Sequence, residues 1–166
     1  HKVAKAGIKR VTGRVIGDET VFDTLRGVAD SGYATSPYVG PLSGLSFNAG
    51  HTGTSFSFSS NPARLASQVM AQELRKRGID VRRSISLKKT PRKVMKHGLV
   101  ARQLSPDMTW MARMTNKNSN NFYAEMLLKN LGATIRKSGT TRAGTIVTER
   151  YARSLGSSIH QVDGSG

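Results

Sequence analysis

NSNNFYAEMLLKNLG, residues 118–132, sets small polar side chains directly before an amphipathic run. The apolar residues recur near helical spacing and the last glycine is a typical stop signal, so we expect a buried helix that ends at Gly132. Ser119 and Asn121 then lie where a loop enters this helix, and their short side chains can point together into a cleft. A helix N-cap is the commoner use of Ser and Asn at such a place, and it is the alternative to a functional role.

Strand signals dominate the first sixty residues. The alternation over residues 8–18 predicts a strand that closes in a Gly-Asp turn. Residues 32–53 are rich in Gly, Ser and Pro, yet short apolar alternations recur at 45–47 and again at 56–58. We therefore expect short strands and loops over this part of the chain instead of a flexible linker.

A helix and a further strand are predicted next. Asn61 as the cap, Pro62 at the first helical position and Gly78 as the stop bound the helix, and residues 79–87 follow as a strand. The side of this helix expected to be buried consists of Leu65, Ala66, Val69, Met70 and Leu74.

The rest of the chain predicts helices. Ser105 and Pro106 are expected to open one helix, as its cap and its first residue, and residues 143–155 form another. The expected buried side of the first of these consists of Trp110, Met111 and Met114.

The fold class that follows is α+β. Composition and periodicity both change near residues 97–104, after a basic connector over residues 90–96. We therefore expect a mixed strand and helix domain over residues 1–100 and a helical part over residues 101–166.

Composition excludes several classes of protein. The 166 residues are 37% hydrophobic, enough for a packed core, and contain no cysteine, so disulfides and thiol chemistry are excluded. No apolar run approaches the roughly 18 residues of a membrane span. The first residues hold neither an initiator Met nor an apolar signal core, which fits a processed chain or a piece of a longer one.

The charge of the chain is large and local. The net charge is +16, and residues 61–104 carry 12 Lys or Arg against two acids. Eight of these cations lie between Arg82 and Arg102 without one acid. Such a patch attracts polyanions, either nucleic acid or an anionic polymer of the cell wall, or it is a solvated surface.

Several segments together resemble a known family, in a consistent order along nearly the whole chain. It is the D-alanyl-D-alanine carboxypeptidase/endopeptidase family of low-molecular-mass penicillin-binding proteins, peptidase family S13. The most specific segment is SNNFYAEMLL at residues 119–128. The others are GIKRVTGRV at 7–15, GPLSGLSFN at 40–48, NPA at 61–63, GIDV at 78–81, LSP at 104–106, GTTRAG at 139–144 and DGSG at 163–166.

The resemblance implies serine acyl transfer on the D-Ala-D-Ala end of peptidoglycan stem peptides, with β-lactams as inhibitors. In this family a Ser-x-x-Lys motif supplies the nucleophile, followed by Ser-x-Asn and Lys-Thr-Gly motifs. Carried over, Ser119 relays a proton to the leaving amine and Asn121 binds substrate amides, because hydroxyl and carboxamide groups both donate and accept. No cofactor or metal is implied, and residues 101–166 become the helical part of a serine β-lactamase/transpeptidase-like domain that carries an inserted domain over residues 1–100.

Two formal matches to the other motifs do not fit their chemistry. Ser86 and Lys89 have the spacing of Ser-x-x-Lys, but they lie in a strand-like segment before Pro91, whereas the motif needs a helix. Lys137 to Gly139 formally matches the third motif but falls between two helices. The chain therefore resembles an interior part of the family that is inactive alone, and an extracytoplasmic location with the signal peptide outside this chain is expected.

Other interpretations stay open. A basic nucleic-acid-binding protein is disfavoured, since aromatic residues are only 6% of the chain and no known binding motif occurs. A catalytically inactive wall-binding module is a second alternative. The four histidines are dispersed and show no metal-ligand spacing, so no metal site is expected. Neither the preference for carboxypeptidase or endopeptidase activity nor the oligomeric state follows from the sequence.

Overall fold

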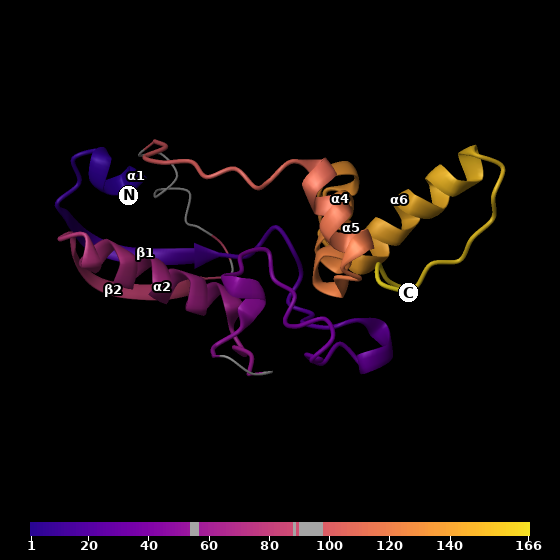
Figure 1. Cartoon of the computed structure of the whole chain (residues 1–166), viewed down its shortest axis with the longest axis horizontal. Helices are drawn as coiled ribbons and strands as arrows, with labels where there is room; N and C mark the ends of the chain where they lie inside the picture. Colours follow the sequence, from indigo (N-terminus) through magenta and orange to yellow (C-terminus); the bar gives the residue numbers. More distant parts are fainter. Residues whose placement is uncertain (54–56, 88, 90–97) are drawn as a thin grey trace.

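The computed structural model describes residues 1–53, 57–87, 89 and 98–166, and its architecture is mixed α+β, as predicted. Figure 1 shows an elongated molecule, with α1, β1, α2 and β2 toward one end and α4, α5 and α6 toward the other. The bounds are α1 Lys2–Lys5, β1 Arg10–Asp18, α2 Pro62–Lys76, β2 Asp80–Leu87, α4 Met108–Lys117, α5 Asn121–Arg136 and α6 Thr141–Ser154. No helix in the described part of the chain is long and apolar enough to cross a membrane.

The two predicted strands are confirmed and pair side by side. β1 and β2 form a parallel two-stranded sheet whose register runs from Arg10 opposite Asp80 to Asp18 opposite Leu87. Parallel strands need a crossover connection, and α2 lies in the one between them. The small core between helix and sheet consists of Ala71, Leu74, Ile79 and Val81, with Val3, Ala4, Ile8, Val11 and Val15 packed against it.

The start of α2 is confirmed, but its predicted buried side is partly wrong. The Asn61 side chain accepts a hydrogen bond from the Arg64 amide at 2.9 Å, and Pro62 is the first helical residue. The buried residues are Pro62, Ala63, Ser67, Ala71 and Leu74, whereas Met70 is 43% exposed. Small side chains face the sheet because the two backbones lie very close: a Cβ on Gly17 would lie 2.4 Å from the Ala63 carbonyl oxygen.

The predicted short strand at residues 45–47 is wrong. In the described part of residues 32–58 the chain forms turns, the 3₁₀ helix Asn48–Gly50 and an isolated bridge between His51 and Phe58. Here the Leu45 carbonyl accepts a hydrogen bond from a side chain, the Ser43 hydroxyl at 2.8 Å, instead of from a neighbouring strand. The other alternation, at 56–58, lies partly outside the described residues, as does the connector over residues 90–96.

The helix expected at Ser105 begins later. Asp107 is the N-cap of α4, and its carboxylate accepts a hydrogen bond from the Trp110 amide at 2.7 Å. No residue of α4 is fully buried; Met111 and Met114 are half-buried and Trp110 is 40% exposed, so the predicted buried side of this helix is only partly right. An acid caps the helix better than Ser105 would, because its charge also complements the helix dipole.

The predicted end of the central helix at Gly132 is also wrong, because α5 continues to Arg136 and ends at Lys137, whose φ is +58°. Gly132 instead permits a close helix contact. A Cβ there would lie 2.7 Å from the Ser138 carbonyl oxygen and 2.8 Å from the Gly144 nitrogen. The last predicted helix is confirmed as α6, which Thr140 caps through the Ala143 amide at 3.0 Å. The division of the chain near residue 100 stays a prediction.

Candidate functional site

The loop before α5 shows which residue caps the helix. The sequence left helix capping and a functional role as alternatives for Ser119 and Asn121. The N-cap is Asn120, whose side-chain oxygen accepts a hydrogen bond from the Tyr123 amide at 3.0 Å. Ser119 precedes it with a φ of +49°, in the left-handed region that non-glycine residues seldom occupy. The capping residue is therefore neither of the two predicted site residues, so Ser119 and Asn121 are not needed to cap the helix.

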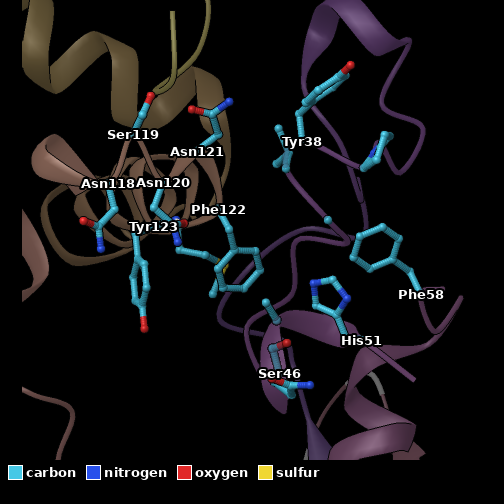
Figure 2. A pocket seen from close by; sticks show the side chains of 16 residues that line it. Tyr38, Ser46, His51, Phe58, Asn118, Ser119, Asn120, Asn121, Phe122 and Tyr123 are labelled. Atoms are coloured by element: carbon cyan, nitrogen blue, oxygen red, sulfur yellow. The ribbon is translucent and has the colours of Figure 1, made fainter. Parts of the chain in front are cut away.

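Ser119 and Asn121 lie together on one wall of a pocket of about 590 Å³. In Figure 2 both side chains point to the same side of the α5 start, whereas Asn118 and Asn120 point to the other. Ser119 is exposed and Asn121 is half-buried. Neither side chain forms a hydrogen bond with any residue in the part of the chain that the structure describes, so the hydroxyl and the carboxamide can bind another molecule.

The opposite wall comes from residues 37–51 and from Phe58, and it was not predicted. Figure 2 shows Tyr38, His51 and Phe58 across the opening from the α5 start. The rings of His51 and Phe58 pack with their centroids 4.5 Å apart, and both residues line the pocket. No local sequence signal identified this wall, because the contact joins segments about 70 residues apart.

Two features of this wall keep the pocket open and polar. Gly40 has a φ of +78°, and a Cβ there would lie 3.3 Å from the Phe58 ring and 3.8 Å from that of Phe122. The Ser46 hydroxyl also lines the pocket, and its oxygen is buried without a hydrogen-bond partner in the described part of the chain. A larger residue at Gly40 would narrow the cavity.

A buried ion pair holds the unpredicted wall in shape. Arg26 contacts Glu19 at 2.7 Å and also donates to the Leu42 carbonyl at 3.0 Å, while the Ser43 hydroxyl donates to Glu19 at 2.6 Å. Burial raises the pKa of Glu19, but the hydrogen bonds from Arg26 and Ser43 outweigh it and hold the pKa below its usual value. The Glu19 carboxylate is therefore charged at neutral pH. Through its hydrogen bond with Ser43, it connects the segment that precedes the wall to the wall.

Apolar packing joins this wall to α5. Val28, Val39 and Leu42 form a buried cluster, and Phe122 and Met126 pack against it. Phe122 directly follows Asn121, so the cluster fixes the first turn of α5 next to the residues that line the pocket. The relative position of the two walls thus depends on this contact.

The far side of α5 anchors the end of the chain. Glu125 is fully buried, and its Oε1 accepts hydrogen bonds from the Gly164 amide, the Ser165 amide and the Ser165 hydroxyl, each at 2.8 Å. Burial raises the pKa of Glu125 above its usual value, although these hydrogen bonds oppose the rise. One turn further, the buried Lys129 contacts Asp23 at 2.6 Å.

The pocket can bind polar groups, and among the described residues that line it His51 is the one that could act as a general base. No Lys, Asp or Glu is among the described residues that line it. Ser86 lies in β2 and Lys137 ends α5, so neither formal motif match has the geometry of the family motif. In the part of the chain that the structure describes, no group of three or more His, Cys, Asp or Glu could hold a metal ion.

Comparison with models of known protein families assigns the chain to one of them. The model of the D-Ala-D-Ala carboxypeptidase 3 (S13) family matches residues 49–166, and the chain belongs to this family. The matched range includes Ser119 and Asn121, and it leaves out the resemblance noted within residues 7–48. A comparison with curated protein sequences gave no match.

Proposed function

We propose that this chain is the substrate-binding part of a serine-type D-Ala-D-Ala carboxypeptidase or endopeptidase of peptidoglycan. Ser119 relays a proton to the leaving amine, and Asn121 binds amide groups of the stem peptide. β-Lactams compete for the same site. Residues 101–166 are the helical part of a β-lactamase-like catalytic domain, residues 1–100 are an inserted domain, and the protein works outside the cytoplasm.

One observation carries the proposal: Ser119 and Asn121 line the same pocket, their side chains point to the same side of the α5 start, and neither forms a side-chain hydrogen bond in the described part of the chain. A hydroxyl and a carboxamide can each donate and accept, as a relay of protons and a recognition of peptide groups both require. The capping role belongs to Asn120, which removes the structural explanation for the other two residues.

The chain contains the second motif of the family, Ser-x-Asn. In its formal match to Ser-x-x-Lys, the serine is Ser86, which lies in a strand and not in a helix. We therefore expect no stable acyl-enzyme when the chain is incubated with a fluorescent penicillin and resolved by denaturing electrophoresis. A covalent label on Ser86 would contradict this expectation, because it would make that serine the nucleophile.

The roles are tested in a longer protein that joins this segment to Ser-x-x-Lys and Lys-Thr-Gly motifs. Ser119→Ala should slow acylation by penicillin, or hydrolysis of the acyl-enzyme, by about tenfold or more, since a positioned proton relay contributes about 10² or more to rate. Ser157→Ala, at an exposed serine beyond α6, is the matched control and should leave both rates unchanged. Equal rates for the wild type and Ser119→Ala would remove the role assigned to Ser119.

A further inference from the structure

The unit made of α1, β1, α2 and β2 has far more exposed cations than acids to neutralise them. All ten Asp and Glu of the chain lie in its described part. Within the unit, Asp80 pairs with Arg10 at 2.9 Å, and Glu73 pairs with Lys76 and Arg77. Within residues 2–89, nine exposed cations form no salt bridge with any residue that the structure describes: Lys2, Lys5, Lys9, Arg14, Arg64, Arg75, Arg82, Arg83 and Lys89.

The strand register places two of these cations next to each other. Arg14 of β1 lies directly opposite Arg83 of β2, and neighbouring strands are only about 4.8 Å apart. Like charges directly opposite each other repel. Four positions earlier in β1, the same sheet pairs Arg10 with Asp80, so a neutralised arrangement is available to this fold. An anion held between the two guanidinium groups would replace the repulsion with charge-assisted hydrogen bonds.

We propose that the exposed cations of β1 and β2, centred on the Arg14–Arg83 pair, bind an anionic phosphodiester-linked polymer of the cell wall. Guanidinium groups match phosphate oxygens in a two-pronged geometry, and two further exposed cations flank the strands, Lys9 directly before β1 and Lys89 just after β2. The binding of a polyanion rests on charge and register alone. The choice of a wall polymer rests on the proposed function, since a peptidoglycan hydrolase works among such polymers.

Composition disfavours nucleic acid as the ligand of this surface. Single-stranded nucleic acids are bound by basic grooves in which bases stack on aromatic side chains. β1, α2 and β2 contain no Phe, Tyr or Trp. The surface therefore offers contacts to phosphates but no platform for bases.

The test measures binding of the full chain to a fluorescent poly(glycerol phosphate) by anisotropy, at several salt concentrations from about 50 mM NaCl upward. The variant Arg14→Gln/Arg83→Gln removes the paired cations and also removes their repulsion, so it should fold at least as well as the wild type. The matched control Arg113→Gln/Arg153→Gln removes two exposed arginines from α4 and α6 and lowers the net charge equally.

We expect the sheet variant to bind about tenfold more weakly or worse, with a salt slope reduced by about 1.4, or about 0.7 for each lost phosphate contact. The control should lose less than about threefold. Equal losses in the two variants would overturn the proposal, because they would reflect net charge alone. Tighter binding to single-stranded or duplex DNA of the same charge would overturn the choice of polymer. Ser119→Ala should bind the polymer like the wild type, so a failure of the proposed catalytic site would leave this result unchanged.

Discussion

Replacing Glu125 with Gln tests how the far side of α5 is stabilised. Glu125 is fully buried, its Oε1 accepts three hydrogen bonds, and its Oε2 is buried without a partner in the described part of the chain. Glutamine keeps the shape and can keep the Oε1 acceptor. It replaces Oε2 with an amide group whose two donors lie where no acceptor is found.

The expected cost depends on pH. Burial raises the pKa of Glu125, so in the fold the carboxyl stays protonated to a higher pH than in the unfolded chain. Against the protonated carboxyl, glutamine exchanges one unpaired O–H donor for two N–H donors, at a cost of about 1–3 kcal/mol. The raised pKa of Glu125 contributes to the free energy of unfolding. This contribution is fully present below the pKa of the unfolded chain, about 4.3, and is lost as the pH rises through the pKa of the folded chain. The wild type is therefore less stable at neutral pH than at acid pH, whereas the stability of Glu125→Gln does not depend on this group because glutamine does not titrate. The difference in free energy of unfolding between the two proteins should shrink as the pH rises.

The assay is urea unfolding of both proteins, followed by circular dichroism, between about pH 4.5 and 8. Comparison of the two curves cancels groups that both share, including Glu73, whose pKa the hydrogen bonds from Lys76 and Arg77 lower to about 2. The change in the difference gives the pKa shift at about 1.4 kcal/mol per tenfold change in proton affinity. A difference that stays constant, or grows, with pH would refute the reasoning that burial dominates at Glu125.

Three further predictions concern the elements that position the pocket. Gly144→Ala should lower the melting temperature by several degrees, because its Cβ would lie 2.2 Å from the Leu128 carbonyl oxygen, and overpacking costs about 1–3 kcal/mol against a gain of about 1 kcal/mol in helix propensity. The control Gly13→Ala, where nothing lies within 4 Å, should not destabilise, and a similar loss in both would contradict the clash. Leu42→Ala should cost about 2–5 kcal/mol in urea unfolding, and a cost below about 1 kcal/mol would show that the two walls are not joined through this cluster. Asn120→Ala should cost about 1 kcal/mol, and Asn120→Asp should restore it, whereas failure of Asp to restore it would exclude the capping role.

The sequence predicted those elements whose signals are local. Asn61 and Pro62 fixed the start of α2, and the alternation before Asp18 located β1, because caps and periodicity need only neighbours in the chain. Gly132 misled the prediction because a glycine can end a helix or admit another backbone, and only the packing of α6 decides between the two. The wall opposite Ser119 could not be predicted for the same reason. It depends on contacts between residues far apart in the sequence.

The backbone at Ser119 strengthens the functional interpretation of the pocket. A positive φ costs a non-glycine residue on the order of 1 kcal/mol or more, and Asn or Gly would adopt it more readily than Ser. The Ser119 side chain does not offset this cost, since it forms no hydrogen bond with any described residue and is exposed. Asn120 alone caps the helix. A serine placed where it stabilises nothing in the described part of the chain, with its hydroxyl in a pocket beside a free carboxamide, is the pattern of a residue that serves a ligand instead of the fold.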